Sequence, residues 1–416
     1  MISSFISAVV RHSGKSFLKF TGDVDDERIA REGSERGGRV SLYIHIPFCK
    51  TLCPFCCFNR YLFKEEQARQ YFRDLRRELD MYAALGFAFN DFYFGGGTPT
   101  VLMDELVGLI GYLRSKFSVK RISLETTPRE LTADSILQLK DIGVNRLSVG
   151  VQSFDNTLLK AMGRTLFKGE DSIEKLTLAQ GKFDTVNVDL MFNFPTQSLE
   201  QFYNDVKIFK GLGTDQATFY PLMPSPHKLD ALTRRFTKVD TSRERDFYRL
   251  ILEDVLDAGY KASTCWCFSR GDRMIDEYII DYDDYIGIGA GSVGFLGDDF
   301  LVNSFSLEGY HGLIQRGRLP LVGRRRLSDN EHHRYYMLTH FFGMKLENDA
   351  FRRRFHSDIH RRLFFELLFF KATGIVTEQN GTLVTTRSGM YPVGTMMKEF
   401  FASLNTLREY CIESGI

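Results

Sequence analysis

The sequence predicts an α/β fold in which helices cover a parallel sheet. Between residues 41 and 220, short runs rich in β-branched and aromatic residues alternate with longer helical patterns, as in repeated βα units. Hydrophobic residues make up 43% and charged residues 26% of the 416-residue chain, which is ordinary for a globular protein. No apolar run reaches the length of about 18 residues that a membrane-spanning helix needs.

The individual elements follow in order along the chain. Strands are expected at 41–46, 91–94, 121–125, 146–149, 185–190 and 216–220. Helices are expected between them at 64–85, 104–116, 132–142, 170–181 and 199–212. A further helix is expected at 243–258, followed by a glycine-rich stretch. Beyond Arg326 the pattern becomes helical, with a hairpin signal at Asn380-Gly381 and a last helix.

Net charge and cysteine content indicate which partners and which cellular compartment to expect. The formal net charge of +1 gives no reason to expect a nucleic-acid partner or an anionic membrane. Four of the seven cysteines lie within residues 49–57, which favours a reduced cytoplasm over a secreted disulfide framework. Residues 1–10 are apolar but lack the basic start of a signal peptide, so a short amphipathic helix on the core is expected there.

Cys49, Cys53 and Cys56 are the most informative residues of the chain. Three thiolates on one short loop can each bind a different iron of a cubic cluster, which leaves the fourth iron open for a substrate or cofactor. A structural zinc loop is the alternative interpretation. Such zinc sites usually have four ligands in paired spacing, and no second pair suits that here.

Polar groups follow the ends of several expected strands. The run Gly95 to Thr100 lets the backbone approach a ligand closely. Glu125 can accept two hydroxyls, or can serve as a helix cap or surface charge. Gln152 both donates and accepts, and the Arg164 guanidinium can fork onto a carboxylate. Asp189 would be a costly buried charge unless it pairs with a ligand or with Arg164 in a structural salt bridge.

These segments together resemble the radical S-adenosylmethionine (SAM) superfamily. The resemblance extends from Tyr43 into the C-terminal region and includes the glycine-rich segment 286–298. It is to the branch of oxygen-independent coproporphyrinogen III dehydrogenase, whose relatives include anaerobic haem-degrading and class C radical SAM methyltransferases and a haem chaperone. The resemblance implies an N-terminal extension (1–40), a partial (β/α)6 TIM-like barrel of radical SAM type with the glycine-rich segment (41–310), and a small winged-helix-like α+β domain (311–416).

The resemblance also implies the cofactors and their residues. A [4Fe-4S] cluster would be held by Cys49, Cys53 and Cys56, and SAM would be cleaved there to a 5′-deoxyadenosyl radical. Tyr43 would face the first sulfonium and belong to the catalytic centre. The other residues implied for the first SAM are Gly96, Glu125 and Val293. Those implied for a second SAM are Phe55, Gly97, Thr98, Gln152, Arg164, Asp189 and, through its backbone, Pro221.

Several segments depart from the family pattern. Cys56-Cys57-Phe58-Asn59 replaces Cys-Gly-Cys, Asn193-Phe194-Pro195 replaces Gly-Leu-Pro, and Glu125-Thr126-Thr127-Pro128 replaces an acid-x-Asp-Pro run. These changes lie beside the implied reaction centre, so the reductive step is expected to be retained while the substrate differs. The segment Cys265-Trp266-Cys267 is interpreted either as buried packing or as a substrate platform or hydrogen donor.

Three functions remain open from the sequence. The favoured one is a transferase in which a second SAM donates a methyl or methylene group to a tetrapyrrole or another conjugated ring. The alternatives are oxidative decarboxylation of coproporphyrinogen III and a non-catalytic haem-binding chaperone. An electron donor such as flavodoxin or ferredoxin is the expected protein partner.

Overall fold

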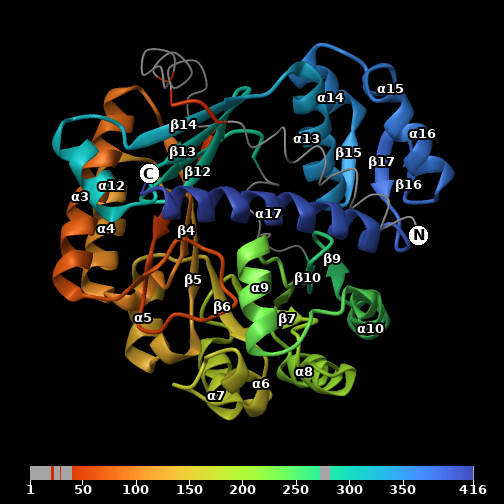
Figure 1. The fold of residues 1–416 in the computed structure, drawn as a ribbon, viewed down its shortest axis with the longest axis horizontal. Helices are drawn as coiled ribbons and strands as arrows, with labels where there is room; N and C mark the ends of the chain where they lie inside the picture. Colours follow the sequence, from red (N-terminus) through yellow and green to blue (C-terminus); the bar gives the residue numbers. More distant parts are fainter. Residues whose placement is uncertain (1–19, 23–28, 30–39, 272–281, 416) are drawn as a thin grey trace.

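The computed structural model describes residues 20–22, 29, 40–271 and 282–415 (Figure 1). The amphipathic helix expected at 1–10 and most of the predicted N-terminal extension lie outside the described residues. Within the described part of the chain, no helix combines the length and apolar character that crossing a membrane requires.

A twelve-stranded sheet forms the centre of the molecule, in the order β14-β13-β12-β11-β1-β4-β5-β6-β7-β8-β10-β9. Its six consecutive parallel strands match the expected βα units. They are β1 (Val40–Ile46), β4 (Phe89–Gly96), β5 (Arg121–Thr126), β6 (Arg146–Gln152), β7 (Thr185–Phe192) and β8 (Gln216–Pro221). The sheet is open, with β14 and β9 as its edges, so the barrel is partial, as predicted.

The glycine-rich stretch adds strands that the sequence pattern did not predict. β11 (Tyr285–Ile288) lies parallel to β1, and β12 (Val293–Leu296) and β13 (Asp299–Asn303) follow antiparallel. Glycine is required because a Cβ atom on Gly287 would lie 2.6 Å from the Val293 carbonyl oxygen. The sheet continues past residue 310 into β14 (Leu321–Arg326), and the domain division at 310 stays a prediction.

Helices cover the parallel strands close to the expected positions. They are α3 (Glu65–Ala84), α4 (Met103–Lys116), α5 (Ala133–Asp141), α7 (Gly169–Ala179) and α8 (Leu199–Leu212). The helices without a sequence prediction are α6 (Asn156–Ala161), α9 (Pro226–Arg235) and α12 (Leu307–Gln315). The helix expected at 243–258 divides into α10 (Glu244–Ile251) and a π-helical turn (Leu252–Leu256). On the antiparallel edge, β9 (Lys261–Ala262) and β10 (Cys267–Ser269) extend the sheet.

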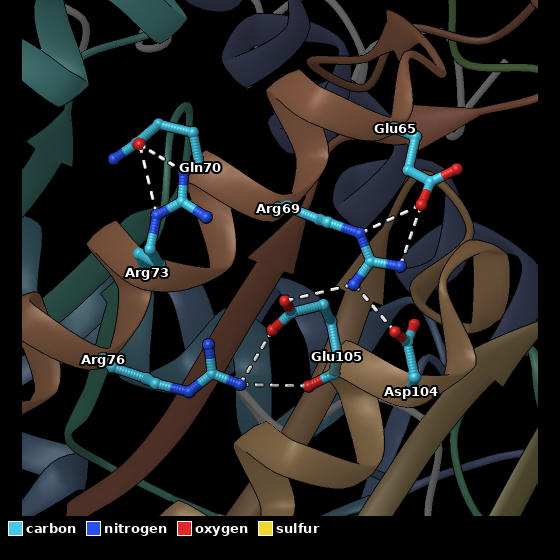
Figure 2. Close-up of polar contacts among 7 residues, drawn as sticks. All are labelled: Glu65, Arg69, Gln70, Arg73, Arg76, Asp104 and Glu105. Carbon is cyan, nitrogen blue, oxygen red and sulfur yellow. Dashed lines mark hydrogen bonds and ion pairs between the residues drawn. The ribbon is translucent and has the colours of Figure 1, made fainter.

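Helices α3 and α4 are joined at their surface by ion pairs (Figure 2). Arg69 of α3 pairs with Glu65 at 2.9 Å on its own helix and with Asp104 at 2.7 Å on α4. Arg76 pairs with Glu105 at 2.9 Å. These contacts link the surfaces of two helices, and because the Arg69 pairs are largely exposed they are expected to add little to stability.

The C-terminal region is a helical unit with a small three-stranded sheet, β15-β17-β16. Its elements are α13 (Asp329–Phe342), β15 (Lys345–Glu347), α14 (Asn348–Phe355), α15 (Ile359–Arg362), α16 (Phe364–Ala372), β16 (Val376–Gln379), β17 (Thr382–Thr385) and α17 (Met390–Glu413). Asn380 and Gly381 form the predicted hairpin turn, with φ values of 51° and 78°. The arrangement is winged-helix-like, and α17 crosses the middle of the molecule above α9 (Figure 1).

Candidate functional site

The three motif cysteines lie on one loop that is closed at its base. The short strands β2 (Phe48–Cys49) and β3 (Tyr61–Leu62) pair in parallel on either side of it. Arg60 donates through Nη2 to the carbonyl oxygens of Cys53 (2.6 Å) and Cys56 (2.8 Å). The three thiols are free and half-buried. A thiol-only donor set on one braced loop fits an iron–sulfur cluster.

Burial controls the protonation of groups beside this loop. It raises the pKa of the Cys49 thiol to about 11, although Thr98 donates to its sulfur at 3.6 Å. Binding of a metal at Cys49 therefore has to displace a proton. Burial also raises the pKa of Cys57. Among the predicted cofactor residues, Thr98 is thus placed directly against the cluster loop.

His45 connects the loop to Tyr43. Burial lowers the pKa of His45 to about 4, so its ring is neutral. Its Nε2 lies 2.8 Å from the Asn59 carbonyl oxygen, which can only accept, so Nε2 carries the proton. Nδ1 is then the acceptor for the Tyr43 hydroxyl at 2.9 Å. This chain of contacts orients Tyr43 from the cysteine loop.

The glycine run begins within strand β4 rather than after it. Gly95 and Gly96 are the last residues of β4, so the predicted strand end at 94 was too early. A Cβ atom on Gly96, whose φ is +110°, would lie 2.6 Å from the His45 ring. A Cβ atom on Gly97 would lie 2.7 Å from the Phe48 carbonyl oxygen. Glycine is needed at both positions because the cysteine loop and β4 approach each other closely.

Glu125, at the end of β5, faces the glycine run. Its Oε1 accepts from the Tyr93 hydroxyl at 2.9 Å, and its Oε2 accepts from the Gly96 amide at 3.2 Å. These partners do not belong to a helix start, so the helix-cap interpretation of Glu125 is wrong. On the other side of β1, Val293 is buried at the start of β12.

Three predicted site residues lie around Gly150: Gln152 at the end of β6, Arg164 in the loop after α6, and Asp189 on β7. A Cβ atom on Gly150 would be 3.2 Å from the Gln152 amide nitrogen and 3.7 Å from Arg164 Nη2. Arg164 donates through Nη1 to the Gly150 carbonyl at 2.5 Å, and its buried Nε has no partner among the described residues. Asp189 is in register with Gly150 and accepts from Ser148 (3.0 Å) and Asn187 (2.7 Å).

Gln152 adopts a strained backbone conformation, with a φ of 74°. A non-glycine residue in the left-handed region costs free energy and is found most often where a site requires it. The functional role of Gln152 stays a prediction, and the strained position lies at the end of β6.

A small apolar cluster lies under the cysteine loop and is separate from the large core. It consists of Phe55, Leu158, Met162, Met191, Phe194, Leu222 and Leu232 and packs against Cys53 and Cys56. Phe55 meets Phe194 edge to face at a centroid distance of 6.2 Å. Pro221, at the end of β8, immediately precedes Leu222 of this cluster.

Asn193 explains one of the departures from the family pattern. It has a φ of 58°, which glycine adopts freely and asparagine tolerates better than most residues. Asn193 therefore keeps a backbone conformation that the usual glycine would allow.

The segment Cys265-Trp266-Cys267 is buried in the described structure. Trp266 packs against Phe342 (4.8 Å between centroids), Tyr220 and Phe401. These contacts favour the packing interpretation of the segment over a substrate platform.

Sequence reasoning missed three residues of the site. Arg60 braces the loop, Tyr93 holds Glu125, and Arg408 lies over the ring of Phe58. Arg60 directly follows the cysteine motif and so had a local signal, whereas Tyr93 lies in a run of buried residues of β4 and had none. Arg408 had none, because it lies more than three hundred residues from the loop in the chain.

Comparison with known proteins identifies a family for the region that contains the cysteine loop and the glycine run. Residues 43–208 match the Radical SAM superfamily. The heme chaperone HemW of Buchnera aphidicola is 30% identical over 269 residues, covering 61% of this chain and 70% of that protein. Anaerobilin synthase of Escherichia coli O157:H7 is 29% identical over 296 residues, covering 68% of this chain and 66% of that protein.

Among solved structures, coproporphyrinogen III oxidase (HemN) from Escherichia coli, described as a radical SAM enzyme, has the same fold. The TM-score is 0.79 at 22% identity, and the superposition covers 92% of this chain and 95% of that one. The superposition includes the C-terminal region as well as the partial barrel.

Proposed function

The chain belongs to the radical SAM superfamily, in the branch of HemW, anaerobilin synthase and HemN, and we propose that it is a radical SAM transferase. Its cofactors are a [4Fe-4S] cluster and SAM. In the proposal, a second SAM donates a methyl or methylene group to a tetrapyrrole or another conjugated ring. A small electron carrier such as flavodoxin or ferredoxin would be the reductant. When bound to Cys49, Cys53 and Cys56, the reduced cluster supplies the electron that cleaves SAM.

The observation that supports a second SAM is the grouping of Gln152, Arg164 and Asp189 around Gly150, while the departures at Cys57, Thr127 and Asn193 favour the transferase over the decarboxylase. A guanidinium can bind a carboxylate through two parallel hydrogen bonds, and a carboxylate can bind an ammonium group. The amino-acid end of SAM carries both charges. These side chains therefore suit a second SAM beside the one expected at the cluster.

The first SAM would be held by the other half of the site. Glu125, supported by Tyr93 and the Gly96 amide, would accept the two ribose hydroxyls. Tyr43, oriented by His45, would lie against the sulfonium. Gly97 and Thr98, where the glycine run meets the cysteine loop, would contribute to the position of the second SAM.

Similarity to two other proteins supports two alternative functions. The similarity to HemN supports oxidative decarboxylation of coproporphyrinogen III as an alternative. A decarboxylase that binds two SAM molecules would use the same SAM-binding residues as the proposed transferase. The likeness to HemW supports haem binding without catalysis.

The deciding experiment uses anaerobically reconstituted protein, a reductant, SAM deuterated at its methyl group, and haem or coproporphyrinogen III. Mass spectrometry follows 5′-deoxyadenosine and S-adenosylhomocysteine. Deuterium in 5′-deoxyadenosine, together with S-adenosylhomocysteine, is the expected result, because the methyl group of the second SAM is then the hydrogen source. Unlabelled 5′-deoxyadenosine with consumption of coproporphyrinogen would establish the decarboxylase instead. Haem binding without any SAM cleavage would establish the chaperone.

A further inference from the structure

Helix α17 brings a cation from the C-terminal region to the cysteine loop. The helix is anchored over the end of the barrel by Asn405, whose Nδ2 donates to the Met223 carbonyl at 2.7 Å. Leu404 and Leu407 are buried on the same part of the helix. Met223 lies two residues after Pro221 of β8, so this anchor fixes the last turns of α17 at the mouth of the candidate site.

Arg408 lies between this anchor and the cysteine loop. Its guanidinium carbon is 5.1 Å from the centroid of the Phe58 ring, and Phe58 directly follows Cys57. Phe58 lies at the end of the cysteine motif, so this contact holds the guanidinium beside the cluster loop.

The hydrogen-bonding capacity of Arg408 is only partly used. Nη1 donates to Asn405 at 2.8 Å, while the buried Nε has no partner in the described residues. No carboxylate of the described residues forms an ion pair with Arg408. Its neighbour Glu409 instead meets His227 of α9 at 3.1 Å. Nη2 of this half-buried guanidinium forms no hydrogen bond with the described residues and is not buried, so it is the nitrogen that suits an anion from outside the protein.

We propose that Arg408 binds a carboxylate of the substrate at the mouth of the site and is a positioning residue that selects acidic rings over neutral ones. The inference rests on the proposed function and names the chemistry of its substrate, a conjugated ring that bears carboxylate side chains. The aromatic ring of Phe58 would keep the guanidinium plane in place while its edge faces the ligand.

The test compares haem, which has two carboxylates, with its dimethyl ester, in which both are masked. Dissociation constants are measured by absorption titration of the cluster-loaded protein and of Arg408→Gln and Arg408→Lys. Wild type should prefer haem over the ester by about 10- to 100-fold, the range of a charge-assisted hydrogen bond. Arg408→Gln should lose this preference without weaker binding of the ester, and Arg408→Lys should fall between the two.

A matched control is Arg387→Gln, which removes one charge just before α17, where Arg387 pairs with Asp257 at 3.0 Å. It should keep the preference. The visible absorbance of the cluster is recorded for each variant, and dissociation constants are compared at equal cluster content, which separates loss of selectivity from loss of the cluster. If Arg408→Gln does not fold, Arg408→Met decides, because it removes the charge while keeping an unbranched side chain, and an unchanged preference in that variant contradicts the inference.

The outcomes separate the inference from the proposed function. An Arg408→Gln variant that still prefers haem overturns the role of Arg408. A wild-type protein that binds haem and its ester equally overturns the inference and leaves the ring substrate in place. A wild-type protein that binds neither compound overturns the tetrapyrrole substrate and the inference with it.

Discussion

The two halves of the candidate site are built differently. On β1, β4 and β5, polar groups hold one another: Glu125 accepts from Tyr93 and from the Gly96 amide. In the second half, by contrast, Gln152 is strained and Arg164 keeps a buried Nε–H without a partner in the described residues, although Asp189 is held by Ser148 and Asn187. Backbone strain and a donor that is unpaired within the described part of the chain therefore distinguish the second half from the first.

Each half is backed by a buried carboxyl group. Glu78 of α3 accepts from the Gly289 amide at 2.9 Å and from Tyr310 at 2.6 Å, behind β1 and β11. Asp205 of α8 accepts from the Phe154 amide and from Ser153, both at 2.7 Å, directly after Gln152. Each half is therefore supported by a buried, hydrogen-bonded carboxyl group, although the residues that would face the ligand are arranged differently.

The largest expected effect comes from removing a cluster ligand, because both halves of the site depend on the cluster. Cys53→Ala should remove the visible absorbance of the cluster and all SAM cleavage, because a three-thiolate site loses one iron ligand. Absorption spectra and 5′-deoxyadenosine formation measure this. Cys267→Ala, which removes a buried thiol of β10, should retain both signals. SAM turnover by Cys53→Ala would rule out the cluster assignment.

The next prediction distinguishes the functions of the two halves by measuring SAM cleavage and product formation separately. Glu125→Gln should lower SAM cleavage by about 10- to 100-fold, because it removes a charged acceptor from the first half. Arg164→Gln should leave SAM cleavage near the wild-type rate and lower the product formed per 5′-deoxyadenosine by a similar factor. Product analysis by mass spectrometry distinguishes these results. If both variants change the same quantity, the division into two SAM positions is wrong.

A smaller effect concerns the buried carboxyl groups. Burial raises the pKa of Glu78 and of Asp205 to about 7. A raised pKa means that the folded state keeps its proton to higher pH than the unfolded state does. The stability contributed by each group is therefore present at low pH and is lost as the pH rises through about 7.

Glu78→Gln and Asp205→Asn should each reduce the fall in unfolding free energy between pH 5 and pH 8 by about 2 kcal/mol. Urea unfolding at several pH values measures the slope, with Glu308→Gln as an exposed control. If only one variant flattens the slope, the two halves are not supported in the same way.

The smallest effect is expected at the surface pairs in Figure 2. Arg69→Ala removes contacts to Glu65 and Asp104 that are exposed to solvent, so thermal unfolding and SAM cleavage should both stay close to wild type. Arg76→Ala tests the less exposed pair with Glu105. A large loss of cleavage in either variant would show that the α3–α4 angle controls the first half of the site.

Local patterns allowed the sequence to predict the six parallel strands, the cysteine loop and the hairpin at Asn380. The contacts that hold the site join distant residues, such as Tyr93 with Glu125 or Asp205 with Phe154, and no periodicity encodes them. The strands of the glycine-rich segment 286–298 were not predicted, because Gly287 serves close strand packing and gives no strand pattern. The roles given to the site residues stay predictions.

Trp266 has a consequence for experiments on the intact chain. It is the single tryptophan of the protein, and it touches α13 through Phe342 and α17 through Phe401. A Cβ atom on Gly394 of α17 would lie 3.0 Å from its indole nitrogen. Its intrinsic fluorescence therefore reports whether helix α17 is packed against the rest of the protein, without any added label. A red shift in emission would signal that this helix, and Arg408 with it, has lifted away.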